Sequence, residues 1–261
     1  MQIRVIRHVR PTYACGDSAP FTASMPPQPI PKSNASPSLL AMLLTVKYVD
    51  SLPLHRFERV LNRHGVDIPR QTLARWVMQC AERLQPLHNL MRDHLLSHDI
   101  IHCDETVVQV LTEPDKPISS HSYMWVQVGG TVQQPVILFD YDAHRSQDVP
   151  VRLLEGWHGY LMTDGYAGYN RVVEQPGVIH LCCMAHARRK FREAKAVQPK
   201  GKVGKADMAL SQIAKLYAVE VAYKDATPQE RYHQRQAQSA PHPEYFAQLA
   251  RRRFTADQQT E

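Results

Sequence analysis

The spacing of apolar residues changes near residue 100 and divides the chain into two kinds of structure. Before that point, apolar residues recur at intervals of three and four, which is typical of a helix with one buried stripe. These residues are Leu73, Trp76, Val77, Cys80 and Leu84. After that point, residues 100–111, 123–128 and 136–141 are rich in β-branched side chains and alternate in polarity, as strands do.

The segments that follow combine strands with helices. Residues 160–164 and 178–182 are expected to be strands, residues 153–157, 186–196 and 208–223 are expected to be helices, and a polar tail starts at Thr227. Three hairpin strands followed by helix–strand alternation predict an α/β protein, with helices packed on a mixed sheet.

The first hundred residues begin with a stretch that we expect not to fold by itself. Prolines interrupt residues 1–36, which favours an extended linker. Ser36 and Pro37 then form an N-cap followed by proline at the first helical position, so a helix is expected over 37–49. A second helix is expected over 54–62, with Gly65 as its left-handed cap, and a third from about Pro69.

Two short helices joined by a turn that contains glycine are typical of a helix-turn-helix. Arg70, Gln71, Thr72 and Arg75 lie at the start of the second of these helices, where such motifs contact DNA. An ordinary helical hairpin with a solvated polar face explains the same pattern, and the sequence leaves both interpretations open.

Charge and cysteine content narrow the class of protein. The net charge of +6 favours polyanionic partners such as nucleic acid, although a solvated basic surface is the commoner explanation. No apolar run approaches the roughly 18 residues of a membrane helix, so no membrane partner is expected. The five cysteines are scattered, which predicts reduced thiols in the cytoplasm.

Two aspartates are candidate metal ligands. Asp104 lies in the first predicted strand, and Asp164 lies where a short strand ends at Gly165. Side chains alternate along a strand, so Asp104 and its neighbour Glu105 are expected to point to opposite faces. Asp104 is expected to share an apolar face with Thr106 and to need a partner from elsewhere in the fold. If the two strands are neighbours, Asp104 and Asp164 meet and suit Mg²⁺ and two-metal phosphoryl transfer. Judged alone, each aspartate is better explained as a cap or turn residue than as a metal ligand, and the pair gains weight only together with the motif that follows.

A further motif combines sulfur, imidazole and dense positive charge. Cys183 and His186 are three positions apart at a strand-to-helix junction. They could supply two zinc ligands. A zinc site needs about four ligands, however, and a buried thiol and an imidazole that orient the turn explain the same spacing. Arg188, Arg189 and Lys190 follow and suit phosphate contacts.

These segments together resemble the insertion-sequence-66 family of transposases. The resemblance covers residues from about Val5 to Glu220 and rests on motifs that occur in the same order. They are Asp104-Glu105-Thr106, Thr163-Asp164-Gly165-Tyr166-Ala167-Gly168-Tyr169, Cys183-Met184-Ala185-His186-Ala187-Arg188-Arg189-Lys190-Phe191 and Leu216-Tyr217-Ala218-Val219-Glu220.

The resemblance implies an RNase H-like catalytic domain with an Asp-Asp-Glu metal triad. It implies that Asp104 and Asp164 are the first two catalytic carboxylates, that Mg²⁺ is the cofactor, and that the partners are terminal-repeat and target DNA; a homo-oligomer is left open. Cys183 and His186 match a Cys/His element of the family. The implied division is a zinc-element remnant and linker (1–36), a helix-turn-helix-like region (37–97), the catalytic core (98–196), and a helical insertion with a polar tail (197–261).

Two departures from the family pattern affect the expected activity. The third carboxylate belongs to an Asn-Asn-x-x-Glu element, and no Asn-Asn pair occurs in this chain. Only Cys15 remains of the paired cysteines at the front. The sequence therefore predicts a transposase fragment, cut at both ends and inactive alone. A non-catalytic DNA-binding module, a decayed gene product and a nuclease of different biology are the alternatives.

Overall fold

The computed structural model describes residues 4–16, 19–131, 133–197 and 203–240. The chain divides into two compact units, Met1–Arg92 and Asp93–Glu261. Among the described residues, no helix has the length and apolar character needed to cross a membrane.

The first unit is built around three helices. They are α1 (Pro37–Tyr48), α2 (Leu54–Arg63) and α3 (Arg70–Leu96), the last of which continues past the boundary of the unit. The hydroxyl of Ser36 accepts a hydrogen bond from the Leu39 N–H, and Gly65 adopts a φ of 76° after α2. The expected caps and all three helices are therefore confirmed.

The core of this unit confirms most of the predicted stripe on α3. Leu73, Trp76, Val77 and Cys80 are buried together with residues of α1 and α2. Leu84, however, is 49% exposed, so its predicted burial is wrong. Helical spacing identifies a face of α3 but not how far along that face neighbouring helices extend.

The proline-rich start of the chain has more structure than expected. The short strands β1 (Thr12–Tyr13) and β2 (Phe21–Thr22) pair antiparallel, and Ile30 and Ala35 are buried in the helical core. The expectation that ordered structure begins only at Ser36 is therefore wrong. Isolated apolar residues pack on helices that are distant in sequence, and periodicity cannot reveal such contacts.

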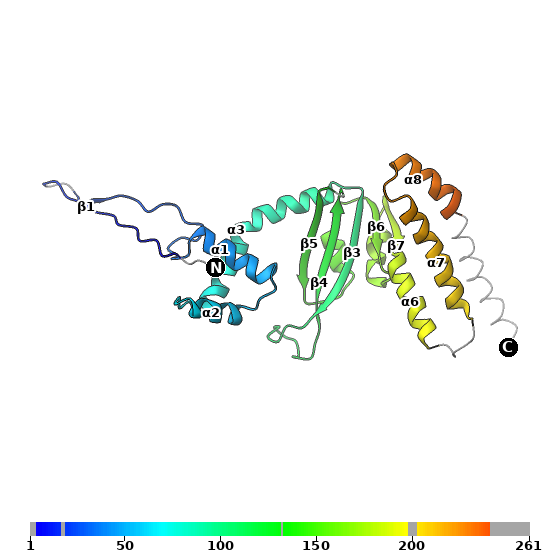
Figure 1. The fold of residues 1–261 in the computed structure, drawn as a ribbon, viewed down its shortest axis with the longest axis horizontal. Helices are drawn as coiled ribbons and strands as arrows, with labels where there is room; N and C mark the ends of the chain where they lie inside the picture. Colours follow the sequence, from blue (N-terminus) through cyan, green and yellow to red (C-terminus); the bar gives the residue numbers. More distant parts are fainter. Residues whose placement is uncertain (1–3, 17–18, 132, 198–202, 241–261) are drawn as a thin grey trace. The chain divides into compact units, whose positions relative to one another are not determined.

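The second unit contains the mixed sheet predicted from the sequence. Its five strands have the order β5-β4-β3-β6-β7 (Figure 1). Antiparallel pairing joins β3 (Ile100–Val108), β4 (Ser122–Gly130) and β5 (Pro135–Asp142), whereas β6 (Gly159–Thr163) and β7 (Val178–Cys182) are parallel to β3. The α/β class and the RNase H-like sheet with flanking helices are thus confirmed.

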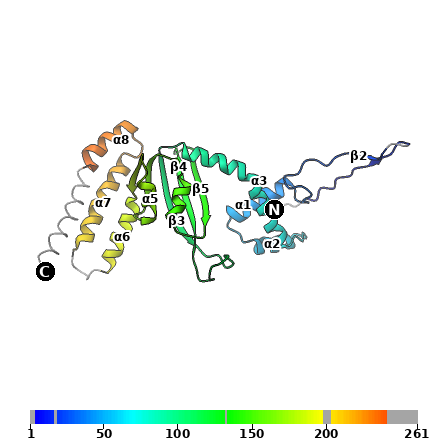
Figure 2. The ribbon, with the colours of Figure 1, turned by 180° about the vertical axis from the view of Figure 1, so that it is seen from behind.

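The two faces of this sheet differ in burial. On one face, residues such as Ile101, Trp125 and Leu161 are buried, and the Trp125 ring centroid lies 5.9 Å from that of Tyr169. Short helices cover this side: α4 (Asp148–Leu153), η1 (Ala167–Tyr169) and α5 (Asn170–Val173) (Figure 2). On the other face, Phe139 is 61% exposed, so that face is open in the described part of the chain.

The remaining helices are α6 (Met184–Ala196), α7 (Lys205–Ala222), α8 (Pro228–Gln234) and the π-helical segment η2 (Arg235–Ser239). The helix expected over 153–157 is displaced, because α4 ends at Leu153 and buried Trp157 instead donates its indole N–H to the His98 carbonyl. We did not predict α8, although Thr227 caps it through the Glu230 N–H and Thr-x-x-Glu is a recognised start signal.

Two leucines of α3 provide a matched test of this packing. Leu73→Ala should lower the free energy of unfolding by about 2–5 kcal/mol, because Leu73 is fully buried and its loss leaves a cavity. Leu84→Ala should change it by less than about 1 kcal/mol. Urea unfolding measures both variants, and equal losses would contradict the burial described here.

Candidate active site

Asp104 and Asp164 lie on neighbouring parallel strands. The register pairs Ile100 with Tyr160, Ile101 with Leu161 and His102 with Met162. Continuing this register by two residues places Asp164, the first residue after β6, level with Asp104. Asp104 belongs to the open side of the sheet, and Asp164 follows β6 at the same end of the neighbouring strand.

The strand β7 brings α6 to the same edge of the sheet. Cys182 pairs with Thr163, and the Cys183 N–H donates to the Thr163 carbonyl over 2.8 Å. The first turn of α6 follows, and its His186 Nε2 lies 3.6 Å from Asp104 Oδ2. Within the described residues, the buried Nδ1 of His186 has no hydrogen-bond partner. Three segments distant in sequence therefore converge beside Asp104.

Asp104 and Glu105 point to opposite faces, as strand geometry requires, but their surroundings differ from our expectation. The Asp104 side chain is 54% exposed, whereas that of Glu105 is 1% exposed. The buried face carries Ile101, Cys103 and Glu105. The expectation that Asp104 occupies the apolar face is therefore wrong, because the strand turns its odd-numbered residues towards the covering helices.

Glu105 is the centre of a buried polar network. Its Oε1 accepts hydrogen bonds from Arg145, including one of 2.8 Å from Nε, and its Oε2 accepts one of 2.7 Å from the Tyr169 hydroxyl. Burial disfavours the charge on Arg145, but the hydrogen bond and the charge of Glu105 outweigh that effect and raise its pKa. Burial raises the pKa of Tyr169 well above its ordinary value, and Cys103 and Glu105 add to the effect. Tyr169 is therefore a hydrogen-bond donor at neutral pH.

The network continues to Asp164 through Tyr166. Asp164 Oδ1 accepts a 2.9 Å hydrogen bond from the Tyr166 N–H. The Tyr166 hydroxyl donates to the Arg145 carbonyl over 2.6 Å, and the Arg145 guanidinium carbon lies 3.7 Å from the Tyr166 ring centroid. An alanine at Gly168 would overlap the Tyr166 ring, so the motif requires glycine there. Asp164 is thus held by the same group of residues that satisfies Glu105.

Sequence reasoning did not identify Glu105, Arg145, Tyr166 or Tyr169 as parts of this site. Both tyrosines belong to the quoted Thr163–Tyr169 motif, so their presence was a usable signal. Arg145 lies in a loop, and nothing in its own segment points to Glu105, which is 40 residues away.

The donor set fits a hard cation only in part. Two carboxylates at one sheet edge suit Mg²⁺, which prefers oxygen ligands. Among the described residues, however, no group of three or more His, Cys, Asp or Glu side chains is arranged to hold a metal. Burial raises the pKa of Cys103 to about 12, with Glu105 and Asp104 adding to the effect, so that thiol remains protonated. Cys183 is half-buried and immediately precedes α6.

The predicted DNA-contacting residues occupy both units. In the first unit, Arg70, Gln71 and Arg75 are exposed and Thr72 is half-buried. The Arg70 N–H, at the start of α3, donates to Glu58 over 2.8 Å. In the second unit, Arg188, Arg189 and Lys190 are exposed on α6.

Removing one hydroxyl tests the buried network. Tyr169→Phe should lower the free energy of unfolding by about 1–3 kcal/mol, because it leaves a buried Glu105 oxygen without its donor. Tyr160→Phe is the control, since Tyr160 is 43% exposed on the open face and should change stability by less than about 0.5 kcal/mol. Thermal or denaturant unfolding measures both, and an unaffected Tyr169→Phe protein would contradict the network.

Comparison with known proteins agrees with the resemblance seen in the sequence. Two uncharacterized proteins of Sinorhizobium fredii (strain NBRC 101917 / NGR234) are similar: y4qI is 30% identical over 73% of this chain and 38% of its own length, and y4jD is 27% identical over 92% and 48%. The chain thus spans less than half the length of these curated relatives.

A solved structure and a family model also match. The cryo-EM structure of a simian T-cell lymphotropic virus intasome, in complex with the PP2A regulatory subunit B56 gamma, overlaps 48% of this chain and 49% of the matched chain at 14% identity, with a TM-score of 0.27. The model described as "Transposase IS66 family" matches residues 32–260. Because that match covers most of the sequence, the chain belongs to the IS66 family of transposases.

Proposed function

We propose that this chain supplies two carboxylates of a DNA-transposition centre, with Asp104 and Asp164 as ligands for Mg²⁺. The observation that carries the proposal is the parallel register of β3 and β6, which supports placing Asp164, directly after β6, near the level of Asp104 on the neighbouring strand. Membership of a transposase family supports phosphoryl transfer on DNA as the reaction class.

The residues around the two aspartates are suited to this role. Mg²⁺, when bound, supplies a positive charge that activates an attacking oxygen and stabilises the leaving one. Asp104 is exposed enough to hold a metal ion beside a bound phosphate group, and His186 lies close enough to orient its carboxylate. The Tyr166 backbone holds Asp164. Sites built on strands and supported by hydrogen bonds keep such groups in position.

Catalysis by this chain alone is expected to be weak. Within residues 4–16, 19–131, 133–197 and 203–240, no third carboxylate joins Asp104 and Asp164. Glu220 is engaged by Arg235, Glu230 lies in α8, and Glu244 lies outside the described residues. Because two-metal chemistry depends on a complete ligand set, we expect strand transfer to be lower by orders of magnitude than with a third ligand.

A second role, DNA binding without catalysis, is favoured by the exposed basic residues. Arg70, Gln71 and Arg75 begin α3 and are accessible, as a recognition helix requires. Loss of terminal-repeat binding in an Arg70→Ala/Arg75→Ala protein, with no effect of Asp104→Asn, would support this role. In this role the chain would bind the ends of the insertion sequence and target DNA.

Metal binding tests the two aspartates directly. Asp104→Asn and Asp164→Asn should each weaken Mn²⁺ or Mg²⁺ binding by at least about tenfold, because each removes an anionic ligand. Asp115→Asn, which removes a carboxylate of the β3–β4 connection, should bind as the unchanged protein does. Isothermal titration calorimetry measures all three. Unchanged affinity in both site variants would overturn the assignment.

The expected weakness of catalysis has its own test. Purified chain incubated with terminal-repeat DNA and Mg²⁺ should show little nicking and no robust joining, since the described ligand set is incomplete. Gel analysis of end-labelled DNA measures both products. Robust joining that persists in Asp104→Asn would contradict both the incomplete-site proposal and the role of Asp104.

A further inference from the structure

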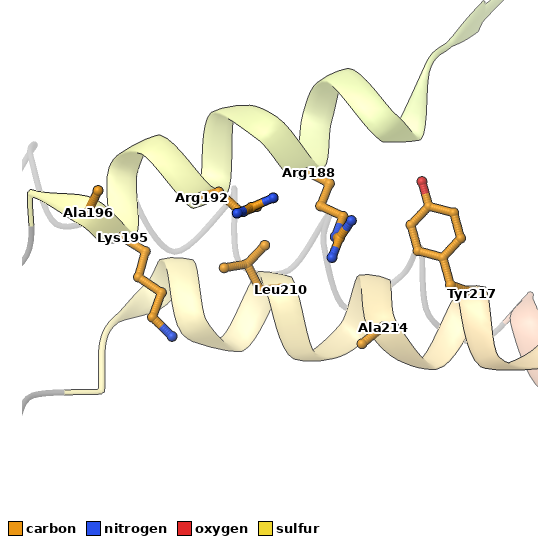
Figure 3. A pocket seen from close by; sticks show the side chains of 7 residues that line it. All are labelled: Arg188, Arg192, Lys195, Ala196, Leu210, Ala214 and Tyr217. Carbon is orange, nitrogen blue, oxygen red and sulfur yellow. The ribbon is translucent and has the colours of Figure 1, made fainter.

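A groove between α6 and α7 lies outside the candidate active site. It has a volume of about 790 Å³, within the range of roughly 300–1,000 Å³ typical of ligand sites. Its walls come from two helices that are consecutive in the described chain (Figure 3). The lining residues are Arg188, Arg192, Lys195 and Ala196 of α6 and Leu210, Ala214 and Tyr217 of α7.

The basic residues of α6 divide into two sets. Arg188, Arg192 and Lys195 are four and three positions apart, which places them on one side of a helix, and all three line the groove, with Arg188 directed from α6 towards α7 in Figure 3. Arg189 and Lys190 are exposed and do not line the groove. Three of the basic side chains of α6 therefore line the groove, whereas Arg189 and Lys190 lie outside it.

The charge of this groove is only partly balanced by the protein. Lys195 forms a 2.6 Å ion pair with Asp207. In the described part of the chain, no carboxylate forms an ion pair with Arg188 or Arg192. Packed helices normally bury apolar side chains between them, whereas Arg188 and Arg192 line this groove and are exposed, so their charge is accessible to an anion from solution.

Tyr217 adds an aromatic wall beside the arginines. The guanidinium carbon of Arg188 lies 5.8 Å from the Tyr217 ring centroid, which limits the freedom of that side chain. Tyr217 is 39% exposed. Arginine beside an exposed aromatic ring is the combination with which proteins bind nucleic-acid strands, because phosphates contact the cation and bases stack on the ring.

We propose that the α6–α7 groove binds the phosphodiester backbone of a DNA strand through Arg188 and Arg192, with Tyr217 available to a base. This inference rests on the proposed function, in that DNA is taken as the substrate. It adds a DNA-contacting site separate from Asp104 and Asp164, and it selects Arg188 and Arg192 over the neighbouring Arg189 and Lys190. Arginine suits the site because its planar fork contacts phosphate through two hydrogen bonds.

The test uses the full chain and two labelled oligonucleotides of one random sequence, a single strand and its duplex. Fluorescence anisotropy in EDTA over a series of salt concentrations keeps metal binding out of the measurement. Arg188→Ala/Arg192→Ala should weaken binding at least about tenfold and reduce the salt slope by about 1–2, since each lost phosphate contact removes about one unit. Arg189→Ala/Lys190→Ala, which removes the same charge from the same helix, should weaken binding by less than about threefold.

Further variants separate the groove from general charge. Arg188→Lys/Arg192→Lys keeps the charge but not the fork, and should retain intermediate affinity even if the alanine variant folds poorly by circular dichroism. Tyr217→Leu should weaken single-strand binding more than duplex binding if a base stacks on the ring. Equal losses in the two alanine variants, or no loss in either, would overturn the proposal.

Failure of this proposal can be told apart from failure of the metal site. Asp104→Asn should bind both oligonucleotides normally in EDTA while losing metal affinity in calorimetry. Absence of oligonucleotide binding by the unchanged chain would refute the groove proposal, and the calorimetric result for Asp104 and Asp164 would stand or fall independently.

Discussion

The parallel hydrogen bonding between β3 and β6 is the constraint on which the candidate site depends. Parallel strands need a crossover between them, and here the chain from β4 through α4 supplies it, so that residues 60 positions apart become neighbours. A shift of one residue in this register would move every side chain of β6 to the other face. Asp164, which follows β6 directly, would then shift relative to Asp104 on the neighbouring strand. The parallel pairing of β3 and β6 thus brings two segments that carry aspartates, distant in sequence, to neighbouring strands.

The register is supported from the covered side of the sheet. Glu105 is buried next to Asp104 in sequence, but it binds Arg145 and Tyr169 instead of facing solvent. Arg145 also stacks on Tyr166, whose backbone holds Asp164. A buried carboxylate is costly unless it is fully hydrogen-bonded, and this network meets that requirement. Because the same residues satisfy Glu105 and position Asp164, we interpret Tyr166 and Tyr169 of the Thr163–Tyr169 motif as structural support for Asp164, not as ligands.

Much of the fold follows from local pattern, and much of the site does not. The change in the spacing of apolar residues predicted β3, β4 and β5, and Ser36 with Pro37 predicted the start of α1. Caps and alternation are signals carried by neighbouring residues. The strand-end position of Asp164 followed from Gly165 in the same way. The burial of Glu105 by Arg145 depends on a contact across 40 residues, and the exposure of Leu84 depends on where neighbouring helices end. Neither is encoded in the nearby residues. The groove beside Tyr217 likewise needed the pairing of α6 with α7, although the basic run on α6 was visible.

The central claim is that Asp104 and Asp164 hold one metal at the open edge of the sheet. Fe²⁺ substituted for Mg²⁺, with ascorbate and hydrogen peroxide, generates hydroxyl radicals that cut the chain beside the bound metal. Mass spectrometry of the fragments then locates the metal without requiring activity. We predict cuts near residue 104 and near residue 164, suppressed by excess Mg²⁺ and lost in Asp104→Asn. Cuts near only one of these positions, or a pattern unchanged by that substitution, would contradict a shared site.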